Sequence, residues 1–83
     1  DMFIIFDNIT SQYLCKDESW YYFNYCTGYA EESPMLFNTI DEANKHKRKV
    51  EKEFFDHGDD IDFMVLEVEE RTVYEVQSEY EGA

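Results

Sequence analysis

The N-terminal segment is the longest unbroken apolar stretch of the chain. Residues 2–6 read Met-Phe-Ile-Ile-Phe and are followed by the polar pair Asp7-Asn8. β-Branched and aromatic residues favour extended structure, so this run predicts a strand that ends near residue 7. Because no polar positions alternate with the apolar ones, we expect both faces of this strand to be covered, as in the centre of a sheet.

The next two apolar segments predict a β-hairpin. Residues 12–15 and 20–25 are rich in aromatic side chains, and the polar residues 16–19 between them suit a four-residue loop. In this register Cys15 lies opposite Trp20.

The middle of the chain predicts a loop followed by a helix. Residues 27–35, which contain the single proline, are irregular and leave room for a short strand. Thr39 and Glu42 have the spacing of a capping box, and Gly58 is well placed to end a helix that runs to about Asp56. The apolar stripe of this helix is interrupted once, by a lysine that we expect to extend toward solvent; the stripe consists of Ile40, Ala43, Lys47, Val50 and Phe54.

The last third of the chain alternates between apolar and polar residues. This pattern predicts two strands, 61–69 and 72–77, separated by a bulge or tight turn at Glu70-Arg71, with residues 78–83 frayed. The element order is β-β-β-α-β-β, which favours an α+β fold with one helix packed on a mostly antiparallel sheet. We expect 83 residues to form one domain, and we interpret Asp1 before Met2 as the remnant of a cleaved tag.

The composition is that of a folded but very acidic protein. Apolar residues make up 43% and aromatic residues 18% of the chain, which is too much for a disordered segment, yet the formal net charge is −13. The predicted helix is neutral, with five acidic and five basic residues, so the rest of the chain carries the whole excess. Such a charge repels nucleic acid and anionic membranes and attracts basic protein surfaces, although it also suits a role in solubility alone.

The acidic residues are densest in the C-terminal third, where only Arg71 opposes them. Residues two apart on a strand share a face at a separation of about 6.6 Å, so Glu67 and Glu69 are expected to project as a row of carboxylates. This spacing is close to that of successive phosphates on a nucleic-acid strand. The alternative is a solvated outer face that discourages aggregation. We interpret the block as a partner-binding surface formed by Asp59, Asp60, Asp62, Glu67, Glu69, Glu70 and Glu75.

Other reactive residues do not combine into a site. Cys15 and Cys26 are too far apart along the hairpin for a disulfide and are expected to be free thiols, as in a cytosolic protein. His46 and His57 lack partners for catalysis, and residues 57–62 lack the ligand series of a calcium loop. We predict no catalytic residue, no cofactor and no metal. We also expect no membrane contact, because the chain has neither a signal peptide nor an apolar span.

The small size, the acidity, the short aromatic strands and the helix start Phe37-x-Thr39-x-x-Glu42-Ala43 together resemble small early proteins of bacteriophages. Members of that class disarm bacterial defence or take over host enzymes, and some are DNA mimics that inhibit restriction enzymes, nucleoid proteins or CRISPR nucleases. The resemblance implies a non-enzymatic inhibitor in the host cytoplasm. Its partner would be a basic, nucleic-acid-binding host protein, for example a CRISPR effector. The alternative is a structural or assembly module that forms homodimers through its aromatic sheet.

Overall fold

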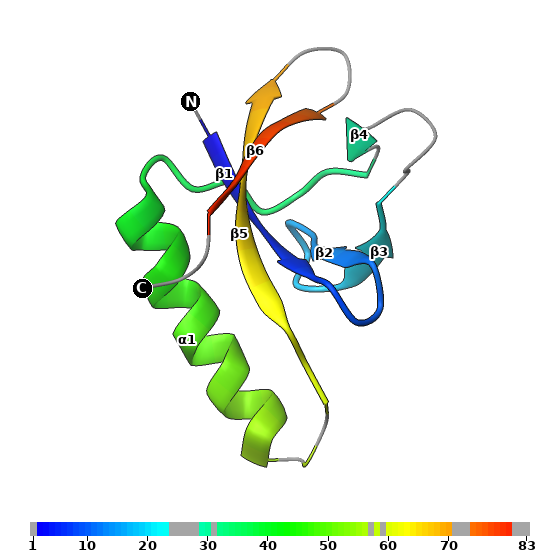
Figure 1. Cartoon of the computed structure of the whole chain (residues 1–83), viewed down its shortest axis with the longest axis vertical. Coiled ribbons are helices and arrows are strands. Elements are labelled where there is room, and N and C mark those ends of the chain that lie inside the picture. Colours follow the sequence, from blue (N-terminus) through cyan, green and yellow to red (C-terminus); the bar gives the residue numbers. More distant parts are fainter. Residues whose placement is uncertain are drawn as a thin grey trace.

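The computed structural model in Figure 1 describes residues 2–23, 29–30, 32–56, 58, 60–70 and 74–80. Its elements follow the chain in the order β1 (Met2–Asp7), β2 (Gln12–Leu14), β3 (Trp20–Tyr22), β4 (Tyr29–Ala30), α1 (Ile40–Asp56), β5 (Phe63–Glu70) and β6 (Tyr74–Tyr80). The predicted α+β class, with one helix on an antiparallel sheet, is confirmed.

The strands that the structure describes form one sheet with the order β3-β2-β1-β5-β6-β4, and each neighbouring pair is antiparallel. β1 pairs with β5 over its whole length, from Met2 opposite Val68 to Asp7 opposite Phe63. β1 therefore lies inside the sheet, as its unbroken apolar run predicted.

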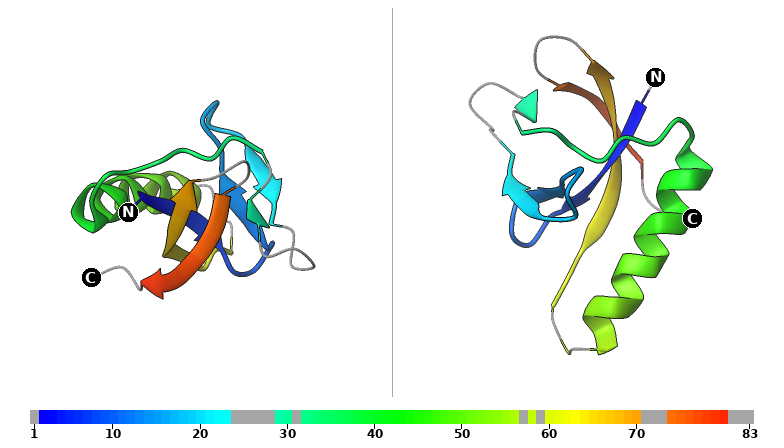
Figure 2. Two further views of the ribbon diagram at one scale, coloured as in Figure 1. Left: turned by 90° about the horizontal axis from the view of Figure 1, so that it is seen from above. Right: turned by 180° about the vertical axis from the view of Figure 1, so that it is seen from behind.

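Apolar side chains pack on both faces of the central strands. On the side of α1, Ile5 and Phe63 pack with Val50 of the helix. On the opposite side a second cluster consists of Ile4, Phe6, Tyr13, Cys15, Leu66 and Val68. Figure 2 shows α1 on one side of β1 and β5. Because both faces are buried, β1 and β5 need apolar residues at consecutive positions.

The sheet curls around the second cluster, and residues 32–37 hold the curl in place. β3 and β4 lie near each other in Figures 1 and 2, although they are at opposite ends of the strand order. After β4, the amide of Met35 donates to the carbonyl of Leu14 (3.0 Å). Phe37 and Phe3 then exchange two backbone hydrogen bonds, each of 2.9 Å. The connection to α1 thus links β2 with β1 and encloses the cluster.

Both ends of α1 agree with the predicted capping residues. Thr39 Oγ1 accepts a hydrogen bond from the amide of Glu42 (3.2 Å), which satisfies one of the free amides of the first turn. After Asp56, Gly58 adopts a positive φ of 75°, and its amide donates to the carbonyl of Phe55 (3.0 Å).

The buried face of α1 contains more polar atoms than its pattern predicted. Ala43 and Val50 are buried as expected, but Lys47 is only 7% exposed and does not extend freely to solvent. Asn44 is also buried, and in the described part of the chain its Oδ1 atom has no hydrogen-bond partner.

The hairpin register differs from the prediction by one residue, since Leu14 and not Cys15 lies opposite Trp20. The turn is tighter than a simple four-residue loop. The amide of Glu18 donates to the carbonyl of Cys15 (2.9 Å), and Glu18 adopts a left-handed φ of 69°. The amide of Cys15 then bonds to the carbonyl of Ser19 (2.8 Å). Residues 16–18 therefore form a three-residue loop that ends in a left-handed residue, one residue shorter than predicted, and this shifts the register by one.

The C-terminal strand is longer than predicted. Residues 78–80, which we expected to be frayed, belong to β6, where Ser78 pairs with Glu67 and Tyr80 pairs with Val65. Backbone hydrogen bonds to β5 outweigh the polar character of this segment. β5 ends at Glu70 and β6 begins at Tyr74, so the two strands separate where the bulge or turn was predicted, although residues 71–73 lie outside the described residues. The pairing of β5 with β6 also has a register shift between Glu67 and Val68.

Candidate functional site

The predicted acidic surface is divided between the two ends of β5. Asp60 and Asp62 precede the strand and are exposed, whereas Glu67 and Glu69 lie near its end. Asp62 and Glu69 are seven positions apart in the sequence, a separation that spans about 23 Å in a strand. One continuous face therefore does not hold the whole set, and Asp59 lies outside the described residues.

At the end of β5, Glu67 and Glu69 lie on the same face of the strand, because they are two residues apart. Glu67 shares a sheet face with Phe63, which packs toward α1, and it is half-buried, while Glu69 is exposed. The backbone of Glu75 pairs with that of Glu69. The side chains of Glu70 and Glu75 lie outside the described residues. Glu67 is half-buried because apolar clusters cover both faces of this strand.

The start of β5 is held by the buried carboxylate of Asp7, which is 5% exposed. Its Oδ1 atom accepts hydrogen bonds from the amides of Ile9 (3.0 Å) and Asp62 (3.3 Å). Its Oδ2 atom accepts one from the hydroxyl of Thr10 (3.1 Å). Asn8 adds a bond from its side-chain nitrogen to Asp62 Oδ2 (3.3 Å). These contacts join the turn after β1 to the start of β5 and position Asp62.

A cavity of about 290 Å³ lies beside this network, and we call it the acidic pocket. It is lined by Asp7, Thr10, Gln12, Trp20, Phe54, Asp60, Ile61 and Phe63. Trp20 stacks on Phe63 with ring centroids 5.0 Å apart and an interplanar angle of 23°. Phe54 meets both rings edge-on, with centroid distances of 6.0 Å to Trp20 and 5.6 Å to Phe63. Three aromatic residues, which form an aromatic wall, and two acidic residues, Asp7 and Asp60, thus line the same space.

The end of the helix adds to the negative potential around the acidic pocket. α1 has no basic residue in its last turn, so no helical side chain there offsets the partial negative charge of its terminal carbonyls. Asp56, Asp60 and Asp62 are all exposed at this end. Two large apolar side chains are also exposed, Ile9 in the turn after β1 by 56% and Phe55 in the last turn of α1 by 62%. The surface combines negative charge with apolar contact area.

Positive charge is concentrated on a different part of the molecule. Of the six Lys and Arg residues in the described ranges, only Lys16 lies outside α1. The exposed ones on the helix follow three- and four-residue spacing and share one face; they are Lys45, Arg48, Lys49 and Lys52.

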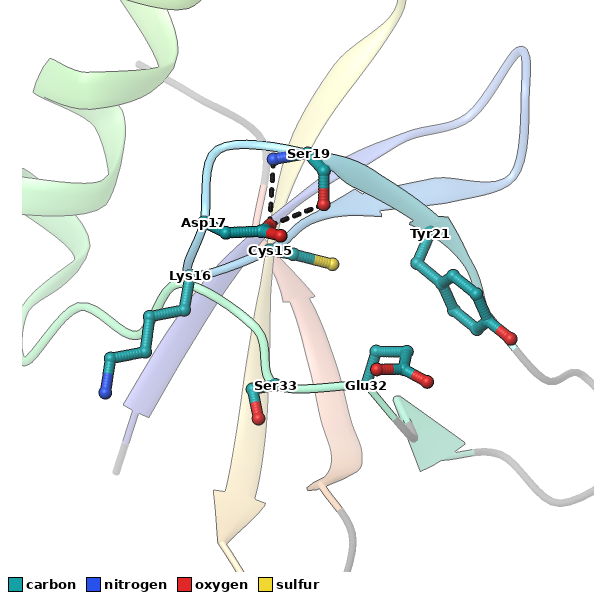
Figure 3. Close-up of a pocket in the computed structure, with 7 residues that line it drawn as sticks. All are labelled: Cys15, Lys16, Asp17, Ser19, Tyr21, Glu32 and Ser33. Carbon is teal, nitrogen blue, oxygen red and sulfur yellow. Dashed lines mark hydrogen bonds between the residues drawn. The ribbon is translucent and has the colours of Figure 1, made fainter.

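A second cavity, of about 360 Å³, lies between the β2–β3 turn and residues 32–33 (Figure 3). Burial raises the pKa of the Cys15 thiol, and a hydrogen bond with Ser19 opposes this only in part. Asp17 accepts hydrogen bonds from the hydroxyl and the amide of Ser19, which lower its pKa. In Figure 3 the Lys16 ammonium group points away from the Cys15 sulfur. A buried, protonated thiol is a poor nucleophile, which agrees with a packing role.

The prediction of a free thiol is confirmed for Cys15, which is buried and unpaired with another cysteine, while Cys26 lies outside the described residues. Within the described ranges, no group of three or more His, Cys, Asp or Glu side chains is arranged to hold a metal ion. No helix in that part of the chain is long and apolar enough to cross a membrane. Comparison with protein-family models, curated proteins and solved structures finds no match.

The sequence analysis identified Asp60, and Asp62 beside it, but missed the other residues that line the acidic pocket. Asp7 could have been found from its position, because an Asp that follows a strand and precedes a turn often binds nearby amides. The aromatic wall could not, since Trp20 and Phe54 are distant in the chain and meet only through the hairpin register and the helix packing.

Proposed function

We propose that this protein is a non-enzymatic inhibitor that binds the basic, nucleic-acid-binding surface of another protein and so acts as an acidic mimic of nucleic acid. The partner would be a host defence or DNA- or RNA-handling protein, for example a CRISPR effector. The observation that carries the proposal is the acidic pocket, which Asp60 lines, together with the exposed Asp56 and Asp62 at the same end of the molecule.

Charge and apolar area would contribute differently to such binding. A net charge of −13 attracts a basic surface over long range and speeds association. The lifetime of the complex depends on a few well-packed side chains, which in protein interfaces are often aromatic. We call the end of the molecule that carries Asp56, Asp60 and Asp62 the acidic end. It offers both charge and apolar area, because Ile9 and Phe55 are also exposed.

The first test is capture of partners from a bacterial lysate at low salt, with mass spectrometry of the proteins that elute as the salt concentration rises. We expect a specific nucleic-acid-binding protein to elute, and we expect added DNA or RNA to displace it at constant salt. Capture that no nucleic acid displaces would contradict the mimicry.

Two matched variants separate a dedicated surface from general charge. Asp60→Asn with Asp62→Asn removes two exposed carboxylates from the acidic end, and Glu18→Gln with Glu32→Gln removes two exposed carboxylates elsewhere. Both variants have the same net charge. We expect the first pair to lower the salt concentration needed for elution and the second to change it little. An equal effect of the two pairs would mean that no dedicated surface exists.

The other end of β5 is tested in the same way. Because Glu67 is half-buried on the side of α1, Glu67→Gln with Glu69→Gln should weaken capture less than the pair at Asp60 and Asp62. A larger effect would move the binding surface to the far end of the strand.

One feature favours self-association as a second candidate function. β3 is at the end of the strand order, and it exposes Tyr21 by 46% and Tyr22 by 65%. An aromatic edge strand can pair with a second copy of itself. Sedimentation velocity over a range of concentrations tests this, and Tyr22→Lys should abolish any dimer that forms through β3. Sedimentation that does not change with concentration would exclude the candidate.

A further inference from the structure

The acidic pocket combines the features that bind a planar cation. Its apolar wall is aromatic, formed by Trp20, Phe54 and Phe63, and its lining includes the carboxylates of Asp7 and Asp60. A guanidinium group stacks on aromatic faces and donates paired hydrogen bonds to carboxylates, which an ammonium group cannot do in the same geometry. We infer that the acidic pocket receives an arginine side chain of the basic partner, an inference that rests on the proposed function.

The acidic pocket is large enough to hold a single side chain. Pockets for drug-sized ligands measure about 300–1,000 Å³. The acidic pocket, at about 290 Å³, lies at the lower limit of that range. An arginine side chain is also long and narrow enough to enter from the surface of a partner while its backbone stays outside.

The two carboxylates have different parts in this binding. Asp7 is buried and held by the amides of Ile9 and Asp62 and the hydroxyl of Thr10, so its negative charge is fixed at the base of the site. Asp60 is exposed, so it lies at the open side of the pocket, where it can meet the incoming guanidinium. A fixed charge costs no reorganisation when the ligand binds.

The aromatic wall is held rigidly for the same purpose. Phe63 is 7% exposed and stacks on one side of the Trp20 ring, while Phe54 packs edge-on. Trp20 itself is half-buried, so part of its indole remains available to a ligand.

The other cavities suit a cation less well. The cavity at Cys15 includes Lys16 in its lining, and a cavity beside Phe37 is bordered by Lys45 and Lys49. A lysine in the lining repels an incoming guanidinium, whereas none of the described residues that line the acidic pocket is basic.

Trp20 is the single tryptophan of the chain, so its fluorescence reports directly on the acidic pocket. The probes are the blocked tripeptides Gly-Arg-Gly, Gly-Lys-Gly and Gly-citrulline-Gly, of which the last has nearly the shape of arginine without its charge. We expect a saturable change with the arginine peptide, a weaker response with lysine and none with citrulline.

Variants connect the response to the acidic pocket. Asp60→Asn should weaken arginine binding about threefold, as loss of one exposed ion pair typically does, while Glu18→Gln removes the same charge elsewhere and should leave it unchanged. Gln12→Lys places a cation in the lining and should abolish the response. Circular dichroism verifies that each variant is folded.

Several results would overturn the inference. They are the absence of a saturable response, equal responses to arginine and citrulline, equal responses to arginine and lysine, or unchanged arginine binding in folded Asp60→Asn. The titration needs no partner protein, so its failure would leave the lysate capture untouched. Conversely, a failed capture would not alter the response to the arginine peptide.

Discussion

Replacing Tyr13 with phenylalanine removes one oxygen atom from the contact that closes the sheet. Tyr13 is 0% exposed, and its ring belongs to the cluster enclosed by the curl. Its hydroxyl donates a hydrogen bond to the carbonyl of Glu32 (2.9 Å) and accepts one from the amide of the same residue (2.6 Å). Phenylalanine keeps the ring packing and loses both bonds.

The expected loss at neutral pH is about 1 kcal/mol of the free energy of unfolding. A hydrogen bond typically contributes about 0.5–1.5 kcal/mol net. Two bonds would suggest more, but Glu32 is exposed, so water can satisfy its carbonyl and amide in the variant. Two bonds would together contribute about 1–3 kcal/mol, and we therefore expect the loss of unfolding free energy to lie at the lower end of that range.

The same hydroxyl makes the free energy of unfolding depend on pH in the alkaline range. Burial raises the pKa of Tyr13, and the hydrogen bond with the Glu32 backbone only partly opposes this. Its contribution to stability is complete below the pKa of an unfolded tyrosine, about 10, and declines as the pH rises above that value. Between pH 10 and 11 the decline is about 0.5–1 kcal/mol, because solvent near Glu32 screens part of the effect.

Urea unfolding at pH 7, 10 and 11, followed by circular dichroism, tests both parts. The parent protein should be about 1 kcal/mol more stable than Tyr13→Phe at pH 7, and the difference should shrink by pH 11. The raised pKa of Cys15 affects both proteins and cancels in the comparison. Equal stability at pH 7, or a difference that grows with pH, would refute the reasoning.

Three further changes test the helix, the aromatic wall and the thiol. Thr39→Ala should cost about 1 kcal/mol in urea unfolding, because the amide of Glu42 loses its cap; no change would mean that the cap is not formed in solution. Phe54→Ala should lower the free energy of unfolding by about 2 kcal/mol, because it loses packing against Trp20 and Phe63. Phe55→Ala, at the exposed neighbouring position, should lower it by less than about 0.5 kcal/mol. Similar losses in the two variants would contradict the orientation of the helix. In a Cys26→Ser background, Cys15 should react with a thiol reagent far more slowly in buffer than in urea; equal rates would contradict its burial.

Local signals in the sequence were sufficient for most elements. The apolar run of β1, the Thr39–Glu42 cap and Gly58 each predicted the correct structure, because each depends on residues close together in the chain. The hairpin register was wrong by one residue, since Glu18 adopts a left-handed conformation that its residue type does not favour. The extent of β6 was wrong because pairing with β5, and not its own composition, decides where it ends.

The candidate site was predicted only in part, for a reason that applies to charge in general. The sequence alone determined that an excess of negative charge lies outside the helix and that Asp60 and Asp62 follow it. It could not determine that β5 separates these residues from Glu69 or that Glu67 faces α1, because exposure depends on what packs above a strand.

The tertiary structure alone decided the acidic pocket. Asp7, Trp20, Phe54 and Phe63 come from β1, β3, α1 and β5, and they meet because an antiparallel sheet places the end of β1 beside the start of β5 while the helix returns to the same end. Residue types determine which side chains can be buried or charged, but the strand order and the crossing of the helix determine which of them share a cavity.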